Sequence, residues 1–193
     1  MPATVKLSLY IHFPFCLKKC LYCSFNSVAG INLPVDEYVA TLIREMELCR
    51  ENLGAHLSAH TLYFGGGTPS LISPELVGRI IDSAAGFFNL AADAEITIEA
   101  NPGSVTRERL SAYRASGINR LSLGVQSFND HFLQRLGRVH NSEQAVEAYV
   151  AAREAGFTNI GVDLINGLPG QTAQMWEYDL SMATDLRPEH LSV

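Results

Sequence analysis

Short apolar segments alternate with longer amphipathic segments along almost the whole of this chain. The pattern predicts strands at residues 7–13, 61–64, 95–100, 120–125 and 159–165. It predicts helices between them at residues 35–52, 74–88, 107–116, 142–155 and 173–184. Strands that are joined through a helix lie parallel, because the helix carries the chain back to the starting end of the sheet. The alternation therefore predicts an α/β fold with a parallel sheet.

The predicted helices also have recognisable ends. Ser73 and Thr106 each precede a helix and can cap it with a side-chain oxygen. Gly117 and Gly156 follow helices at positions where a left-handed backbone is common. These signals fix the lengths of the helices and leave short connections between the elements.

Two consecutive strand–helix units resemble each other. Residues 114–118 and 153–157 both end a helix with a glycine and lead into a strand, so that Leu121 and Leu123 correspond to Ile160 and Val162. A repeated unit of this kind favours a parallel barrel, although a doubly wound sheet has the same handedness rule. Residues 189–193 look like the start of a sixth strand. We therefore expect residues 1–193 to form one domain, a partial TIM-like barrel that is truncated at about its sixth strand within a longer natural protein.

The composition excludes several classes of function. A formal net charge of −6 argues against nucleic acid, which binds basic surfaces. No apolar run reaches the ~18 residues that would span a bilayer, so we expect no integral membrane segment. The N-terminus lacks the apolar region of a secretory signal, and we expect a cytoplasmic protein.

Three of the four cysteines, Cys16, Cys20 and Cys23, lie within eight residues just after the first predicted strand. Thiolates suit iron–sulfur clusters and zinc. In a four-iron cluster three cysteines leave one iron open to a cofactor, whereas structural zinc needs four closed ligands. His12 or Cys49 is the candidate fourth ligand in that alternative, although we expect Cys49 to be a small buried residue of a helix.

Further candidate residues follow the other predicted strands. Gly65, Gly66 and Gly67 form a turn after the second strand, where backbone groups are open to a ligand. Glu99, Gln126 and Asp163 lie near the ends of the next three strands, at the edge where parallel barrels place their active sites. Arg138 and His140 fit either a solvated turn or this site, and Tyr10 fits either strand packing or the site.

These motifs together resemble the radical S-adenosylmethionine (SAM) superfamily. More narrowly, the chain is similar to the oxygen-independent coproporphyrinogen III oxidase family and its HemW-type heme chaperone branch. The resemblance covers almost the whole chain and is carried by residues 10–16, 65–70, 99–103, 122–128, 136–138 and 167–170.

The resemblance implies roles for individual residues. Cys16, Cys20 and Cys23 would ligate a [4Fe–4S] cluster. Residues at positions that contact SAM in the family would line its site, with the glycine turn near the methionyl amine and Glu99 toward the ribose. They are Tyr10, Tyr22, Gly66, Gly67, Thr68, Glu99, Gln126, Arg138 and Asp163.

The resemblance also implies two candidate functions. One is a chaperone that binds heme as cargo and passes it to an acceptor hemoprotein, with an electron donor for the cluster. The other is oxidative decarboxylation of coproporphyrinogen III to protoporphyrinogen IX. Similar oxidases carry a further cysteine two residues after the third, but here Ser24 and Phe25 follow Cys23. The chain therefore looks like the chaperone branch.

Overall fold

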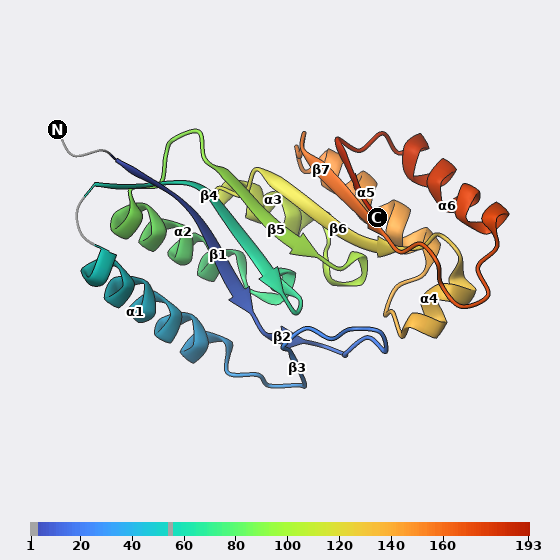
Figure 1. The fold of residues 1–193 in the computed structure, drawn as a ribbon, viewed down its shortest axis with the longest axis horizontal. Helices are drawn as coiled ribbons and strands as arrows, with labels where there is room; N and C mark the ends of the chain where they lie inside the picture. The colour runs from blue at the N-terminus through green and yellow to red at the C-terminus, as the bar shows by residue number, and fades with distance from the viewer. Residues whose placement is uncertain (1–3, 54–55) are drawn as a thin grey trace.

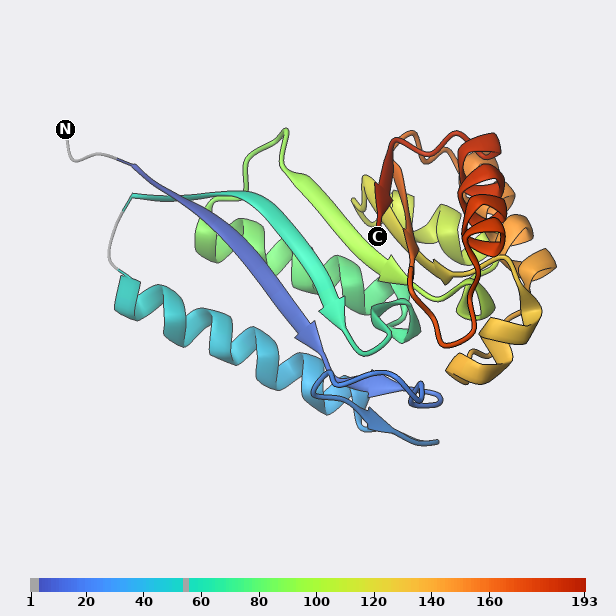
Figure 2. The ribbon, with the colours of Figure 1, turned by 45° about the vertical axis from the view of Figure 1, so that its right-hand side comes forward.

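The computed structural model describes residues 4–53 and 56–193, and its centre is one parallel sheet. The strands occur in the order β1-β4-β5-β6-β7-β8, so each new strand joins the outer edge of the one before it. A doubly wound sheet reverses this order at a switch point, whereas a barrel does not. Figures 1 and 2 show the arrowheads pointing to the same end of the sheet. The strands are β1 (Val5–Phe13), β4 (Leu57–Gly66), β5 (Glu95–Ala100), β6 (Arg120–Gln126), β7 (Ile160–Leu164) and β8 (His190–Ser192).

Six α-helices connect the described strands. In Figure 1, α2, α3 and α5 lie behind the sheet. The predicted caps are confirmed, since Leu76 N donates to Ser73 Oγ and Arg109 N donates to Thr106 Oγ1. The helices are α1 (Val35–Leu53), α2 (Pro74–Phe88), α3 (Arg107–Ala115), α4 (Asp130–Leu136), α5 (Ser142–Glu154) and α6 (Ala173–Asp185).

Shorter elements occupy the loops. The strands β2 (Phe15–Cys16) and β3 (Val28–Ala29) pair in parallel beside the end of β1, and they enclose the cysteine loop. Two 3₁₀ turns, η1 (Pro69–Leu71) and η2 (Pro102–Ser104), follow β4 and β5.

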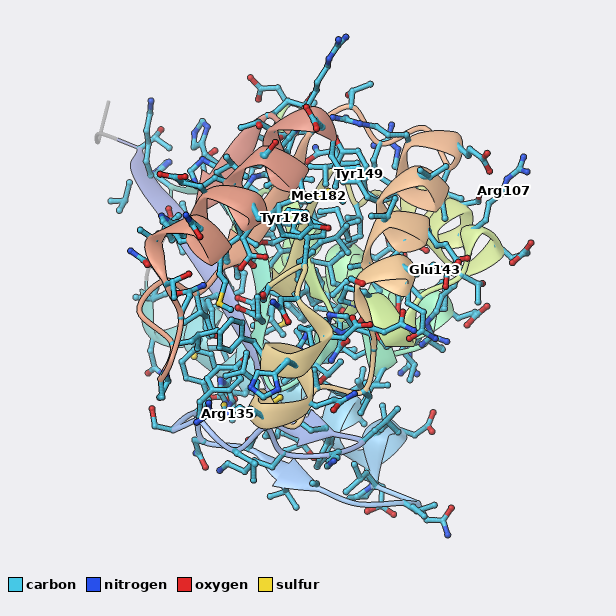
Figure 3. The ribbon with its side chains drawn as sticks, turned by 90° about the vertical axis from the view of Figure 1, so that its right-hand side faces the viewer. Arg107, Arg135, Glu143, Tyr149, Tyr178 and Met182 are labelled. Carbon is cyan, nitrogen blue, oxygen red and sulfur yellow. The ribbon has the colours of Figure 1, made fainter. Side chains whose placement is uncertain are left out.

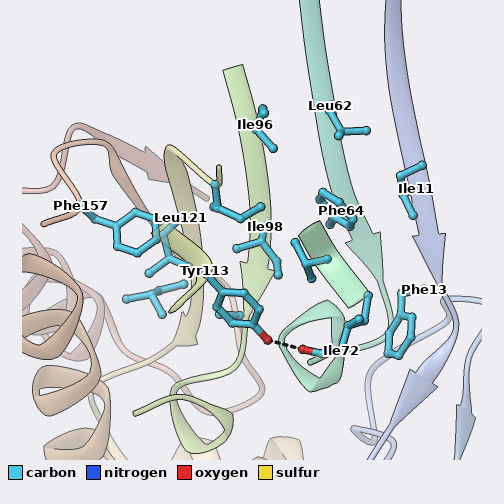
Figure 4. Close-up of a cluster of buried hydrophobic side chains, with 14 of the residues drawn as sticks. Ile11, Phe13, Leu62, Phe64, Ile72, Ile96, Ile98, Tyr113, Leu121 and Phe157 are labelled. Carbon is cyan, nitrogen blue, oxygen red and sulfur yellow. Dashed lines mark hydrogen bonds between the residues drawn. The ribbon is translucent and has the colours of Figure 1, made fainter. Parts of the chain in front are cut away.

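The sheet has two chemically different faces. Side chains at alternate positions, such as Phe64, Ile98 and Leu121, are fully buried in the apolar core against the helices (Figure 4). The residues between them, including Tyr63 and Glu99, point to the opposite face because successive side chains of a strand alternate. The apolar face holds the fold together and leaves the other face free for polar groups.

Equivalent positions of the internal repeat lie side by side in two neighbouring strands. Leu121 pairs with Ile160 and Leu123 pairs with Val162 across β6 and β7, which are the correspondences expected from the sequence. The sixth strand is also present, as β8.

Two details differ from the expectations. The helix α4 was not predicted, because at seven residues it is too short to show helical periodicity, although Asn129 and Gly137 cap its ends. The expectation that Cys49 is buried is wrong, since it is exposed on α1. Only Val39 and Met46 are buried on that helix, so its covered stripe is narrow and Cys49 lies outside it.

Candidate functional site

A cavity of about 450 Å³ lies at the carboxyl ends of the strands, where the cysteine loop meets the sheet. Polar side chains of the open face and backbone of the loops form its walls. The predicted residues that line it are Cys16, Cys20, Tyr22, Cys23, Gly66, Gly67, Thr68, Glu99, Gln126, Arg138 and Asp163. Tyr10 is not among the lining residues, because its ring stacks on that of Tyr63 with 5.8 Å between centroids.

Backbone hydrogen bonds hold the cysteine loop, residues 17–27, at its base and in its middle. Gly30 N donates to Cys16 O at 3.2 Å, and Leu21 N donates to Leu136 O at the end of α4 at 3.0 Å. Lys18 and Lys19 also line the cavity and bring positive charge next to the thiols. This charge would offset that of bound thiolates and a cluster.

Among residues 4–53 and 56–193, no three His, Cys, Asp or Glu side chains surround the position of a single metal ion. In a four-iron cluster each thiolate binds a different iron, so cluster ligands stand farther apart than the ligands of one ion. Neither candidate for a fourth zinc ligand completes a closed site: His12 Nε2 lies 2.9 Å from Asn26 O, and Cys49 does not line the cavity. Three thiols around one cavity fit a cluster better than zinc.

The glycine turn touches the cysteine-bearing segment through its backbone. Gly67 N donates to Phe13 O at 2.7 Å, and Thr68 N donates to Phe15 O at 2.9 Å. A Cβ on Gly67 would stand 2.7 Å from Phe15 O and 3.0 Å from Cys16 Sγ. Only glycine permits this close approach, so the position of the turn fixes the position of the first cysteine beside it.

Two half-buried carboxylates supply hydrogen-bond acceptors inside the cavity. Glu99 accepts from Tyr63 OH at 2.8 Å and from Gly66 N at 3.2 Å. Burial raises the pKa of Glu99, and these two hydrogen bonds oppose the rise. Burial also raises the pKa of Asp163, which accepts from Ser122 Oγ at 3.0 Å. Both groups therefore suit ligand hydroxyls or ammonium groups, which compensate a buried carboxylate.

Arg138 joins the cysteine loop to the sheet and keeps one donor unused. Its Nη1 lies 3.4 Å from Cys20 Sγ, and its Nη2 donates to Gly124 O at 2.6 Å. Its buried Nε has no hydrogen-bond partner among the residues that the structure describes. An unpaired buried donor is unfavourable, so this Nε–H indicates an acceptor on a bound ligand, such as a carboxylate.

Sequence reasoning missed several residues of the cavity. Tyr63 orients Glu99, Ser122 orients Asp163, and Asn101, Ser192 and Phe25 complete parts of the wall. The available signal was the alternation within strands, since Tyr63 and Ser122 occupy the polar positions between buried apolar neighbours.

His140 is buried, with Nε2 3.2 Å from Val125 O, and burial lowers its pKa to about 4.

Comparisons with known proteins agree with this geometry. Residues 10–183 match the Radical SAM superfamily. The alignment with the heme chaperone HemW of Escherichia coli covers 96% of this chain with 43% identity, and the alignment with HemW of Haemophilus influenzae covers 100% of this chain with 40% identity. The chain resembles the solved structure of the coproporphyrinogen III oxidase HemN from Escherichia coli, a radical SAM enzyme, with 35% identity over 98% of this chain and a TM-score of 0.87.

The match leaves a large part of each relative uncovered. The chain spans 51% of the Haemophilus influenzae HemW, 49% of the Escherichia coli HemW and 44% of the HemN chain.

No helix among the described residues is both long and apolar enough to cross a bilayer.

The close contact at Gly67 predicts that alanine is destabilising at this position and stabilising at Gly86. Gly67→Ala forces a methyl group against Phe15 O and Cys16 Sγ, so it should lower the melting temperature and the iron content after anaerobic reconstitution. Gly86→Ala is the control, because nothing lies within 4 Å of its added methyl group in α2. The control should stabilise the protein by about 0.5–1 kcal/mol. Equal iron content and melting temperature in both variants would contradict the close approach.

Proposed function

This chain belongs to the radical SAM superfamily, and from that premise we propose that it is the cofactor-binding part of a heme chaperone, which binds heme and passes it to acceptor hemoproteins. The observation that carries the proposal is the motif itself: three cysteines line the cavity, and Phe25 stands where similar oxidases carry a further cysteine. The names of the HemW relatives support the same reading.

Membership of the superfamily implies a [4Fe–4S] cluster and SAM, and the residues of the cavity fit both. Cys16, Cys20 and Cys23 would hold the cluster. The bound pair supplies one-electron chemistry, for which a reduced electron donor is a further partner. The chain's own groups would bind and orient SAM: Glu99 would accept from hydroxyls of the ribose, and Arg138 Nε would donate to a carboxylate.

A second candidate function is oxidative decarboxylation of coproporphyrinogen III. It is favoured by the structural similarity to HemN, which includes the whole cavity-bearing sheet. The absence of the further cysteine argues against it. We therefore place it second and test both functions on the same preparation.

The experiment uses the full-length protein after anaerobic reconstitution with iron, sulfide and SAM. We expect heme to bind stoichiometrically, seen by its absorbance, and to move to an apo-cytochrome, restoring that protein's own spectrum. Coproporphyrinogen III with reductant and SAM is offered in parallel, and we expect no protoporphyrinogen IX. Turnover of coproporphyrinogen without heme transfer would replace the first proposal by the second.

Loss of one thiol should remove the cluster. Cys20→Ala leaves the cavity with two of its three proposed ligands, so the brown colour and visible absorbance of the reconstituted protein should disappear, with iron falling to background. Cys49→Ala is the matched control, since this exposed cysteine lies outside the cavity, and it should retain full iron content. A complete cluster in Cys20→Ala would refute the ligand assignment.

Glu99→Gln should weaken SAM binding without affecting the cluster. Loss of a charged acceptor is expected to raise the Kd for SAM about 10- to 100-fold. Burial raises the pKa of Glu99, so this carboxylate is protonated at a higher pH than an exposed glutamate. On acidification, the affinity of the wild-type protein for SAM should therefore begin to fall at that higher pH. The variant should lack this step. Equilibrium dialysis at several pH values measures the Kd for SAM, and iron analysis measures the cluster content. Joint loss of SAM binding and iron would instead make Glu99 structural.

A further inference from the structure

Two turns that belong to motifs of the resemblance supply no residue to the cavity wall and still lack a role. One is the turn at Ser127 and Phe128 after β6, and the other is the turn at residues 167–171 after β7. Only the residues just before these turns, Gln126 and Ile165, line the cavity. Both turns contact α6, which Figure 3 shows with its Tyr178 and Met182 labelled.

A single carboxylate on α6 contacts both turns. Asp179 is fully buried. Its Oδ1 accepts from Phe128 N at 2.6 Å, and its Oδ2 accepts from Ser127 Oγ at 2.8 Å and from Gln171 Nε2 at 3.4 Å. Burial raises the pKa of Asp179, and these donors oppose the rise. A buried carboxylate is tolerated where hydrogen bonds compensate the lost hydration, as they do here.

Gln171 extends the contact to the second turn. Its Oε1 accepts from Gly167 N at 2.8 Å and from Leu168 N at 3.2 Å. The amide therefore accepts from the turn with its oxygen and donates to Asp179 with its nitrogen. Arg135 Nη1 also donates to Pro169 O at 2.8 Å, which attaches the same turn to α4.

The first turn needs an anchor because its backbone is strained. Gln126 has a φ of 73°, which is uncommon for a residue other than glycine and persists only when the surroundings enforce it. Its carbonyl accepts from Ile165 N at 2.9 Å, so the two cavity-lining residues are joined directly. The next residue, Ser127, is the one that Asp179 holds.

We propose that Asp179 is a positioning residue, whose buried carboxylate fixes the turns after β6 and β7 so that Gln126 and Ile165 keep their places in the SAM cavity. The proposal rests on the proposed binding of SAM at this cavity. The proposal gives both turns the same physical role. They supply the donors and acceptors of one hydrogen-bond network that connects α6 to the cavity.

The test exchanges the carboxylate and the amide across this contact. In Asp179→Asn the new amide can still accept from Phe128 N, but its NH₂ faces the NH₂ of Gln171. In Gln171→Glu alone, two carboxylates face each other. The double variant restores one donor and one acceptor, and it leaves an oxygen for Gly167 N and Leu168 N. Asp185→Asn is the control, because it makes the same chemical change at an exposed position of the same helix.

We expect each single variant to raise the Kd for SAM about fivefold or more, and the double variant to return it close to the wild-type value. Iron content and far-UV circular dichroism should stay unchanged, while amide exchange at residues 126–128 and 167–171 should accelerate only in the single variants. Additive effects in the double variant, or unchanged exchange in Asp179→Asn, would overturn the proposal. Failure of the wild-type protein to bind SAM would refute the proposed function instead, and the exchange data would still decide whether Asp179 holds the two turns.

Discussion

The site depends on the contact between the glycine turn and the segment that carries the first cysteine. The ladder between β1 and β4 ends with Phe13 opposite Gly66, and the next two amides of the turn then donate to Phe13 O and Phe15 O. Because this contact is made by backbone, it leaves little freedom for either loop. The proposed cluster ligand Cys16 and the proposed SAM-binding turn are thereby placed by the same hydrogen bonds that extend the sheet, and no flexible side chain stands between them.

The second constraint is the polar face of the sheet. Partial burial raises the pKa values of Glu99 and Asp163, and the buried Nε of Arg138 has no partner in the described part of the chain. An apolar filling would stabilise the fold more than these groups do. Locally unfavourable groups that gather in one cavity indicate a ligand that satisfies them, which is why the cavity is a better guide to function here than the core.

The sequence predicted the parts of this structure that depend on regular spacing. Strand–helix alternation was sufficient for a parallel α/β sheet but left the choice between a barrel and a doubly wound sheet open. The repeat between residues 114–118 and 153–157 identified Leu121 and Ile160 as equivalent positions, and the structure pairs them. Asp179 could not be predicted, because its partners lie in two turns that are distant in sequence. Tyr63 looks like an ordinary strand residue until β5 places Glu99 within reach of its hydroxyl.

The cavity and the difference between the two proposed functions depend on different residues. The chain is similar to a chaperone-type and to an oxidase-type relative over almost its whole length, so the geometry of the cavity alone favours neither function. Position 25 is the local difference: Phe25 is exposed at the cavity wall, and its carbonyl accepts from Lys19 Nζ at 3.2 Å. An apolar ring at this place cannot donate a thiol hydrogen or ligate iron. The aromatic side chain instead offers an exposed apolar surface beside the cysteine loop, and under the proposed chaperone function this surface would suit contact with the planar heme.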